Sequence, residues 1–294
     1  MSDLATRVAD SVRQHFVSLS CVQDLPDSEI RKVLVFSGFV VEIADEWFYI
    51  TAGHILRRIR TAQKTGSTFD AWRLGDHTAG NKFNGMAVPY DFQLDQWCVI
   101  EDEDQGLDYA AVHIGGLYRR QLEVGGISPL KKAAWATPDM NHDHWVLAGI
   151  PSESVSYDGI TNIAARFVAA PLSSTAAPPL AGPRSQNQFY ALLADGGEEA
   201  VRDIDGMSGG PVFMLKHEDG KWKYGVIGVQ SGWYRADRTI VACPFASFAV
   251  ALEEAIQSAL QHNSSAEAQP VLPKPSTGGP AESTRGGSGK SSSS

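Results

Sequence analysis

Three short segments of the chain carry side chains that could act together in nucleophilic catalysis. In chain order they are Thr51-Ala52-Gly53-His54, Leu107-Asp108-Tyr109 and Gly206-Met207-Ser208-Gly209-Gly210. A serine hydroxyl is a weak nucleophile unless a base lies beside it, and an imidazole, with an ordinary pKa of about 6.5, can serve as that base. A carboxylate can in turn orient the imidazole. These residue types therefore match the needs of acyl transfer.

The segment around Ser208 is the most specific of the three. Glycines on both sides of a serine allow a backbone turn that other residues rarely adopt. Such a turn can aim the N–H groups of Gly206 and Ser208 at one point, where they would stabilise an oxyanion. An ordinary Gly-Ser turn needs neither the double glycine nor the proline and strand that follow. We therefore interpret Ser208 as a nucleophile.

His54 and Asp108 are weaker signals when each is taken alone. His54 follows a predicted strand at 47–51, where a single histidine is more often structural. Asp108 opens a predicted strand at 108–114, where an aspartate usually belongs to a turn. A carboxylate that enters a core needs a hydrogen-bond partner, however, and a histidine N–H would supply one. We therefore expect the two side chains to meet.

Together the three segments resemble those of the chymotrypsin/trypsin-like serine peptidases. Thr-Ala-Gly-His is similar to the family's Thr-Ala-Ala-His around the histidine. Asp-Tyr-Ala-Ala-Val is similar to the family's segment at the catalytic aspartate, and Gly-Met-Ser-Gly-Gly-Pro matches its Gly-x-Ser-Gly-Gly-Pro around the serine. The order His, Asp, Ser is also the family's order. The resemblance runs from about Val33 to Ile256 and is closer to the compact bacterial members.

This resemblance implies an all-β fold of two six-stranded antiparallel β-barrels. His54 and Asp108 would come from the first barrel and Ser208 from the second. Ser208 would attack the scissile carbonyl, His54 would act as general base and then general acid, and Asp108 would hold the imidazole. The N–H groups of Gly206 and Ser208 would form the oxyanion hole, and the substrate would be a protein or peptide.

The resemblance further implies residues that bind the substrate. Gly228-Val229-Gln230-Ser231-Gly232 is similar to the family strand that pairs with the substrate backbone, which points to Ser231 and Gly232. Arg202, six residues before Ser208, would lie at the floor of the specificity pocket and favour an acidic side chain before the cleaved bond. Met207 replaces the aspartate that pairs with a new N-terminus in zymogen-activated members, so activation by that route is not expected.

The elements that must position these residues are mostly short strands. Runs of β-branched and aromatic residues broken by turn residues are typical of strands and hairpins. They occur at 33–36, 39–43, 47–51, 96–100, 108–114, 144–150, 161–170, 188–193, 211–214, 223–230 and 239–242. Without helical patterns between them, these runs predict an all-β barrel or sandwich, with a surface loop at the Pro/Ala-rich 171–184.

Helical periodicity is confined to the two ends of this β-rich region. Leu4, Val8, Val12 and Phe16 recur every four residues and predict a packing helix over 4–20. We expect an N-terminal helical extension at 1–30 and a trypsin-like serine peptidase domain at 31–262. Its parts would be barrel one at about 31–125, barrel two at about 143–246 and a C-terminal helix at about 246–262. The Ser/Gly/Pro-rich residues 263–294 would form a disordered tail.

Composition disfavours several partners and compartments. With 25 Lys and Arg against 34 Asp and Glu, the chain has a formal charge of −9, which does not favour nucleic acid or anionic membranes. Its three cysteines form no C-x-x-C pair, and the N-terminus lacks the apolar core of a signal peptide. We therefore expect a cytoplasmic protein.

His142-Asp143-His144 has no third ligand at a recognised spacing, so neither a metal nor another cofactor is expected.

Two other functions remain open. Gly206-Met207-Ser208-Gly209-Gly210 also satisfies the G-x-S-x-G pattern of α/β-hydrolase esterases, but these need Ser before Asp before His on a parallel sheet. Only His217 and His262 follow Ser208, so an esterase is the minor alternative. The second alternative is a catalytically silent or latent trypsin-like module that binds peptides, because a distorted oxyanion hole can silence an intact triad. The oligomeric state is left open.

Overall fold

The computed structural model describes residues 3–29, 31–75, 87–140, 144–158, 163–194, 201 and 203–267. The chain divides into two compact units, residues 1–256 and residues 257–294. All candidate site residues belong to the first unit, and of the second only the helical residues up to Glu267 are described. The C-terminal helix continues to Glu267, five residues into the predicted tail at 263–294, and the part of that tail beyond residue 267 lies outside the described residues.

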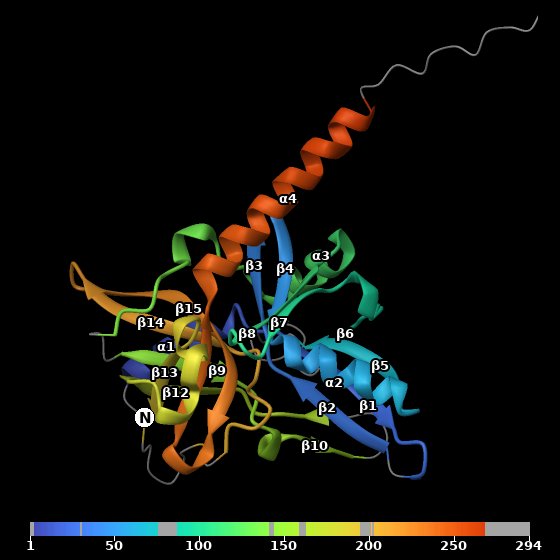
Figure 1. Cartoon of the computed structure of the whole chain (residues 1–294), viewed down its shortest axis with the longest axis horizontal. Helices are drawn as coiled ribbons and strands as arrows, with labels where there is room; N and C mark the ends of the chain where they lie inside the picture. Colours follow the sequence, from blue (N-terminus) through green and yellow to red (C-terminus); the bar gives the residue numbers. More distant parts are fainter. Residues whose placement is uncertain are drawn as a thin grey trace, which may run out of the picture. The chain divides into compact units, whose positions relative to one another are not determined.

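Two four-stranded sheets form the first half of unit 1 (Figure 1). One has the order β2-β1-β5-β6, and its strands are β1 (Ser18–Asp24), β2 (Arg31–Phe36), β5 (Thr68–Gly75) and β6 (Val88–Pro89). The other has the order β3-β4-β8-β7, and its strands are β3 (Phe39–Ile43), β4 (Glu46–Thr51), β7 (Cys98–Asp102) and β8 (Leu107–His113). Apolar side chains of both sheets pack into one core, which includes Leu19, Val40, Tyr49, Leu74 and Val112.

The expectation of two closed barrels is only half correct, because one closed barrel is found in the described part of the chain. In the first half, β2 and β6 are the edges of one sheet, and β3 and β7 are the edges of the other. Closure needs continuous hydrogen bonding from edge to edge. β6 has only two residues, and one of them, Pro89, has no N–H to donate. The first half is therefore a pair of sheets around a shared core.

The second half forms the closed barrel, with the strand order β12-β13-β16-β15-β14-β9. These strands are β9 (Trp145–Gly149), β12 (Val168–Thr175), β13 (Phe189–Leu193), β14 (Pro211–Glu218), β15 (Lys221–Tyr234) and β16 (Thr239–Pro244). All neighbouring pairs are antiparallel. Alternate side chains fill the interior, among them Trp145, Leu147, Leu172, Phe189, Val212 and Ile240. The prediction of a six-stranded antiparallel barrel is confirmed for this half.

A second apolar cluster joins the two halves. It takes Phe39 and Tyr109 from the first half and Phe213, Val229 and Phe245 from the second. Each of these side chains is at most 4% exposed. Because interiors pack at crystal-like density, such a contact sets the position of one half against the other. Residues of β4 and β8 are thereby held against the loop that precedes β14.

The N-terminal segment differs from its prediction. The helix over 4–20 is shorter than expected, since α1 spans Asp3–Arg13 and β1 begins at Ser18. β1 pairs with both β2 and β5, and six of its seven residues are buried. Backbone pairing on both sides of the strand outweighs the four-residue periodicity that continues to Phe16.

Two helices interrupt the β-rich region where no helical pattern was recognised. These are α2 (Gly53–Lys64) and α3 (Gly116–Gly125). The long apolar side chains that α2 buries are Ile55, Leu56 and Ile59, a pattern too short to be distinguished from a strand. β12 also continues to Thr175, into the predicted surface loop at 171–184.

The remaining elements are small or terminal. A hairpin joins β10 (Ser156–Tyr157) to β11 (Ile163–Ala164), and α4 spans Phe245–Glu267. Short 3₁₀ helices lie at Leu94–Gln96, Lys132–Ala134, Ser152–Ser154, Pro179–Gln186 and Arg235–Asp237. None of the helices in the described ranges is both long enough and apolar enough to cross a membrane.

Candidate active site

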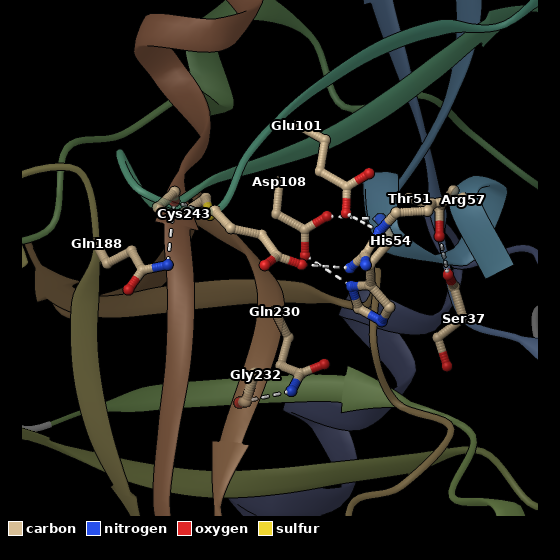
Figure 2. A network of polar contacts seen from close by, with 12 residues as sticks. Ser37, Thr51, His54, Arg57, Glu101, Asp108, Gln188, Gln230, Gly232 and Cys243 are labelled. Atoms are coloured by element: carbon tan, nitrogen blue, oxygen red, sulfur yellow. Dashed lines mark hydrogen bonds and ion pairs between the residues drawn. The ribbon is translucent and has the colours of Figure 1, made fainter. Parts of the chain in front are cut away.

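The side chains of His54 and Asp108 meet where β4, α2 and β8 come together. Thr51 of β4 pairs with Ala110 of β8, which places the first turn of α2 beside Asp108. His54 Nδ1 lies 2.7 Å from Asp108 Oδ2, and the backbone N–H of His54 donates to Asp108 Oδ1 at 2.8 Å (Figure 2). An ionised carboxylate only accepts hydrogen bonds, so Nδ1 carries the proton and Nε2 is the basic nitrogen.

The pair is buried. His54 and Asp108 are each 9% exposed, and a carboxylate that is removed from water is costly unless donors surround it. Gly53 packs closely against this pair. A Cβ at Gly53 would lie 3.0 Å from the Tyr109 carbonyl oxygen and 3.1 Å from Asp108 Oδ1. The small residue before the histidine therefore has a steric role.

Ser208 lies in a loop that is bent by two glycines with left-handed backbone. The φ angles are +90° at Gly206 and +86° at Gly209, a region that favours glycine. A Cβ at Gly209 would lie 2.9 Å from the backbone nitrogen of Ala52, two residues before His54. The serine loop thus lies directly against the segment that carries the histidine. No hydrogen bond in the described part of the chain involves Ser208 Oγ, although Ser208 and His54 line the same cavity.

The peptide groups of this loop have defined directions. The Asp205 carbonyl accepts the Ser152 N–H at 2.6 Å, and the Met207 carbonyl accepts the Gly210 N–H at 2.9 Å. In a trans peptide the C=O and the following N–H point in opposite directions. The N–H groups of Gly206 and Ser208 therefore point away from those partners.

Gly206 and Ser208 both border the cavity. Across the described ranges, neither of their N–H groups donates to a protein acceptor. Two N–H donors without a protein acceptor, on either side of one residue, match the requirement for oxyanion stabilisation.

Ser37 belongs to this site but was not recognised in the sequence, and Thr51 was recognised only as part of the segment that carries His54. Ser37 is fully buried, and its hydroxyl donates to the Gly206 carbonyl at 2.9 Å and accepts the Ile150 N–H at 2.9 Å. The Thr51 hydroxyl donates to the Ser37 carbonyl at 2.8 Å, as Figure 2 shows. In the sequence, Ser37-Gly38 is indistinguishable from an ordinary turn between two strands.

Of the expected substrate-binding residues, Ser231 and Gly232 border cavities at the site, whereas the position of Arg202 is not described. Ser231 and Gly232 of β15 line the cavity over Ser208, which has a volume of about 780 Å³, and also an adjacent cavity of about 360 Å³ that reaches Asp108. Gln230, 1% exposed, donates from Nε2 to the Gly232 carbonyl at 2.9 Å. Arg202 lies outside the described residues.

Beneath Asp108 lies a buried thiol. The Ser231 hydroxyl hydrogen-bonds Cys243, whose Sγ also donates to the Gly106 carbonyl at 3.3 Å. Cys243 is fully buried, and this burial raises the pKa of its thiol to about 12. The thiol therefore stays protonated near neutral pH, which suits a structural contact rather than a nucleophile.

Metal ligands are not grouped in the part of the chain that the structure describes. No three His, Cys, Asp or Glu residues gather there in a way that could hold an ion. His142 and Asp143 of the sequence cluster fall outside the described residues.

Comparisons with known proteins identify structural neighbours. No protein-family model matches the sequence, and no curated protein matches it significantly. The chain is similar to the thermostable serine protease AL20 from an extremophilic microorganism, with 16% identity, a TM-score of 0.43, and coverage of 82% of this chain and 95% of that one.

Two further neighbours are also proteases. The active form of the Rv3671c protease from M. tuberculosis has 16% identity, a TM-score of 0.41, and coverage of 83% of this chain and 82% of that one. The protease Anisep from Arthrobacter nicotinovorans has 16% identity, a TM-score of 0.40, and coverage of 79% and 90%. With identities this low, the assignment of function depends on the geometry of this chain's own residues.

Proposed function

We propose that the chain is a serine endopeptidase that hydrolyses peptide bonds through Ser208, His54 and Asp108. The observation that carries this proposal is the contact of Asp108 with His54 Nδ1 at 2.7 Å, at the edge of a cavity that Ser208 also lines. That contact leaves Nε2 free to accept a proton within the cavity. A base held in one tautomer beside a serine in a glycine-bent loop supports nucleophilic catalysis.

In the proposed reaction, His54 Nε2 takes the Ser208 proton while Oγ attacks the scissile carbonyl carbon. The negative charge that develops on the carbonyl oxygen is stabilised by the N–H groups of Gly206 and Ser208. The imidazolium then gives its proton to the leaving amine, and an acyl-enzyme remains. Water, deprotonated by His54, attacks the ester carbon, and the imidazolium returns the proton to Ser208 Oγ as the ester bond breaks and the acid leaves. Asp108 keeps Nδ1 protonated throughout.

One observation favours a second candidate, a latent or silent peptide-binding module. In the described ranges Ser208 Oγ makes no hydrogen bond to His54. Catalytic hydrogen bonds are often long before substrate binds and tighten in the complex, so this geometry is also compatible with an active enzyme. An esterase of the α/β-hydrolase kind is disfavoured by the antiparallel barrel and by the order His, Asp, Ser.

A fluorophosphonate probe, which reacts with activated serines, tests the proposal. Wild type should be labelled, while Ser208→Ala and His54→Ala should not. Ser28→Ala, which alters an exposed serine in the turn between β1 and β2, is the matched control and should label like wild type. Absence of labelling in a well-folded wild type would contradict the peptidase and support the latent module.

A further inference from the structure

The cavity over Ser208 is lined by more cations than anions. Lys32, Arg58 and Arg235 border it, and Asp205 is the one carboxylate among its described lining residues. Arg235 binds Asp205 at 2.6 Å and Asp203 at 2.7 Å, so these charges are already paired. In the described part of the chain, the exposed side chains of Lys32 and Arg58 make no ion pair. They leave two uncompensated positive charges at the cavity of a chain whose formal charge is −9.

The adjacent cavity, on the Asp108 side of His54, has a different balance of positive and negative side chains. Its described lining residues include four carboxylates, Glu101, Asp102, Glu103 and Asp108, and three guanidinium groups, Arg57, Arg58 and Arg184. Arg57 is bound to Glu101 at 2.6 Å and to Glu103 at 2.9 Å. Of these two cavities, which share Arg58, only the one that contains Ser208 has more cations than carboxylates among its described lining residues.

Strand β2 supplies one wall of that cavity. Residues 32–36 all line it, and β2 is an edge strand whose only strand partner within the described ranges is β1. A further cavity of about 450 Å³ continues along the same strand and shares Lys32, Val33 and Val155 with the first. An unpaired strand edge can take up an extended peptide as an added strand, with backbone hydrogen bonds for affinity and side-chain contacts for specificity.

We propose that Lys32 and Arg58 select acidic side chains in the half of the substrate that leaves as the amine. This inference rests on the proposed peptidase function. Ser231 and Gly232 border both cavities and would pair with the acyl half of the substrate. A chain whose scissile carbonyl lies at Ser208 then continues along β2.

The two cations differ in their distance from the cleaved bond. Arg58 lies one helical turn after His54, near the position of the leaving nitrogen. Lys32 lies four residues from Phe36, about 13 Å along an extended strand. Arg58 therefore contacts side chains close to the bond, and Lys32 contacts side chains about three or four positions further on.

Cleavage of a random peptide library, read by mass spectrometry, tests this selection. Glu and Asp should be enriched about 1.5-fold to fivefold on the amine side of the cleaved bonds, as expected for exposed charge pairs. The enrichment should shrink in about 0.5 M salt. Lys32→Glu and Arg58→Glu should each reverse it towards Lys and Arg. Arg60→Glu, on the same helix but outside both cavities, is the matched control and should keep the wild-type preference.

A binding measurement separates this inference from the catalytic proposal. Fluorescence anisotropy would compare labelled Glu/Ala and Gln/Ala oligopeptides on the Ser208→Ala chain, with and without Lys32→Glu. Tighter binding of the Glu peptide, lost with Lys32→Glu, would uphold the charge selection even if wild type cleaves nothing. Three results would overturn the charge selection: cleavage without acidic enrichment, enrichment only on the acyl side, or equal binding of both peptides. None of them would contradict the peptidase proposal.

Discussion

The Ser37 hydroxyl donates a hydrogen bond to the Gly206 carbonyl oxygen at 2.9 Å, across 169 residues of sequence. The same hydroxyl accepts the Ile150 N–H, and the Ser37 carbonyl accepts the Thr51 hydroxyl. Ser37 therefore ties the loop of Ser208 to the end of β4, three residues before His54. In the proposed mechanism it is a positioning residue, because it holds the Gly206 peptide without touching the reacting atoms.

Replacement of Ser37 by alanine should weaken both stability and reaction. The Gly206 carbonyl and the Ile150 N–H would lose their partner, and a buried unpaired polar group costs about 1–3 kcal/mol. We expect urea unfolding to show a loss in that range. The folded fraction should show a lower kcat with a nearly unchanged KM. A fall in stability with an unchanged kcat would mean that Ser37 is structural only.

Replacement of Gly53 by alanine should disturb the contact between His54 and Asp108. The new Cβ would lie 3.0 Å from the Tyr109 carbonyl oxygen and 3.1 Å from Asp108 Oδ1, so these neighbours must move by a few tenths of an ångström. We expect the rate of fluorophosphonate labelling to fall by about twofold to threefold, because the displacement is small and the peptidases that the chain resembles carry alanine at this position.

Gly115→Ala is the matched control for the Gly53 variant. A Cβ at Gly115 meets no atom within 4 Å, and its φ is −59°, which any residue adopts. Its labelling rate should equal that of wild type. An equally fast Gly53→Ala would show that the site tolerates the displacement.

Replacement of Gly209 by alanine should destabilise the chain more than the same change at Gly220. Both have positive φ, +86° and +73°, and should share a backbone strain of about 1–2 kcal/mol. A Cβ at Gly220 meets nothing within 4 Å, whereas one at Gly209 would lie 2.9 Å from the backbone nitrogen of Ala52. Chemical denaturation measures the difference, and equal losses would show that the serine loop can shift away from β4.

The thiol of Cys243 should be unreactive in the folded chain. Burial raises its pKa to about 12, so the folded state keeps the proton that the unfolded state loses at about pH 9. The contribution of the protonated Cys243 thiol to the unfolding free energy is fully present below pH 9 and is lost as the pH rises towards 12. We therefore expect the unfolding free energy to decrease above pH 9, and less steeply in Cys243→Val.

Thiol titration provides a second measurement. Cys21 and Cys243 are buried and Cys98 is exposed, so one thiol should react with a disulfide reagent near pH 8 in the native state and all three in denaturant. Rapid reaction of two or more thiols in the native state would contradict the burial of Cys243.

Sequence reasoning worked best where a signal is local. The glycines around Ser208, the small residues before His54 and the aspartate at the start of a strand lie within a few positions of the groups they serve. Turn geometry and side-chain chemistry depend on such near neighbours, so the candidate residues could be predicted without the structure. The strand patterns alone predicted an all-β barrel or sandwich, and the six-stranded antiparallel barrel came only from the resemblance to the serine peptidases. The helical periodicity of residues 4–20 was misleading because β1 lies between two strands that only the fold brings to it.

The sequence by itself thus determined the types of reacting group, their order along the chain and its β-rich character. Tertiary structure decided that Asp108 binds both the backbone N–H and Nδ1 of His54, that Ser37 holds the Gly206 peptide, and that the first half remains two open sheets. It also placed Lys32 and Arg58 at the cavity of Ser208. Each of these relationships joins residues distant in sequence, and their proximity depends on strand pairing and core packing over the whole unit, which no local pattern encodes.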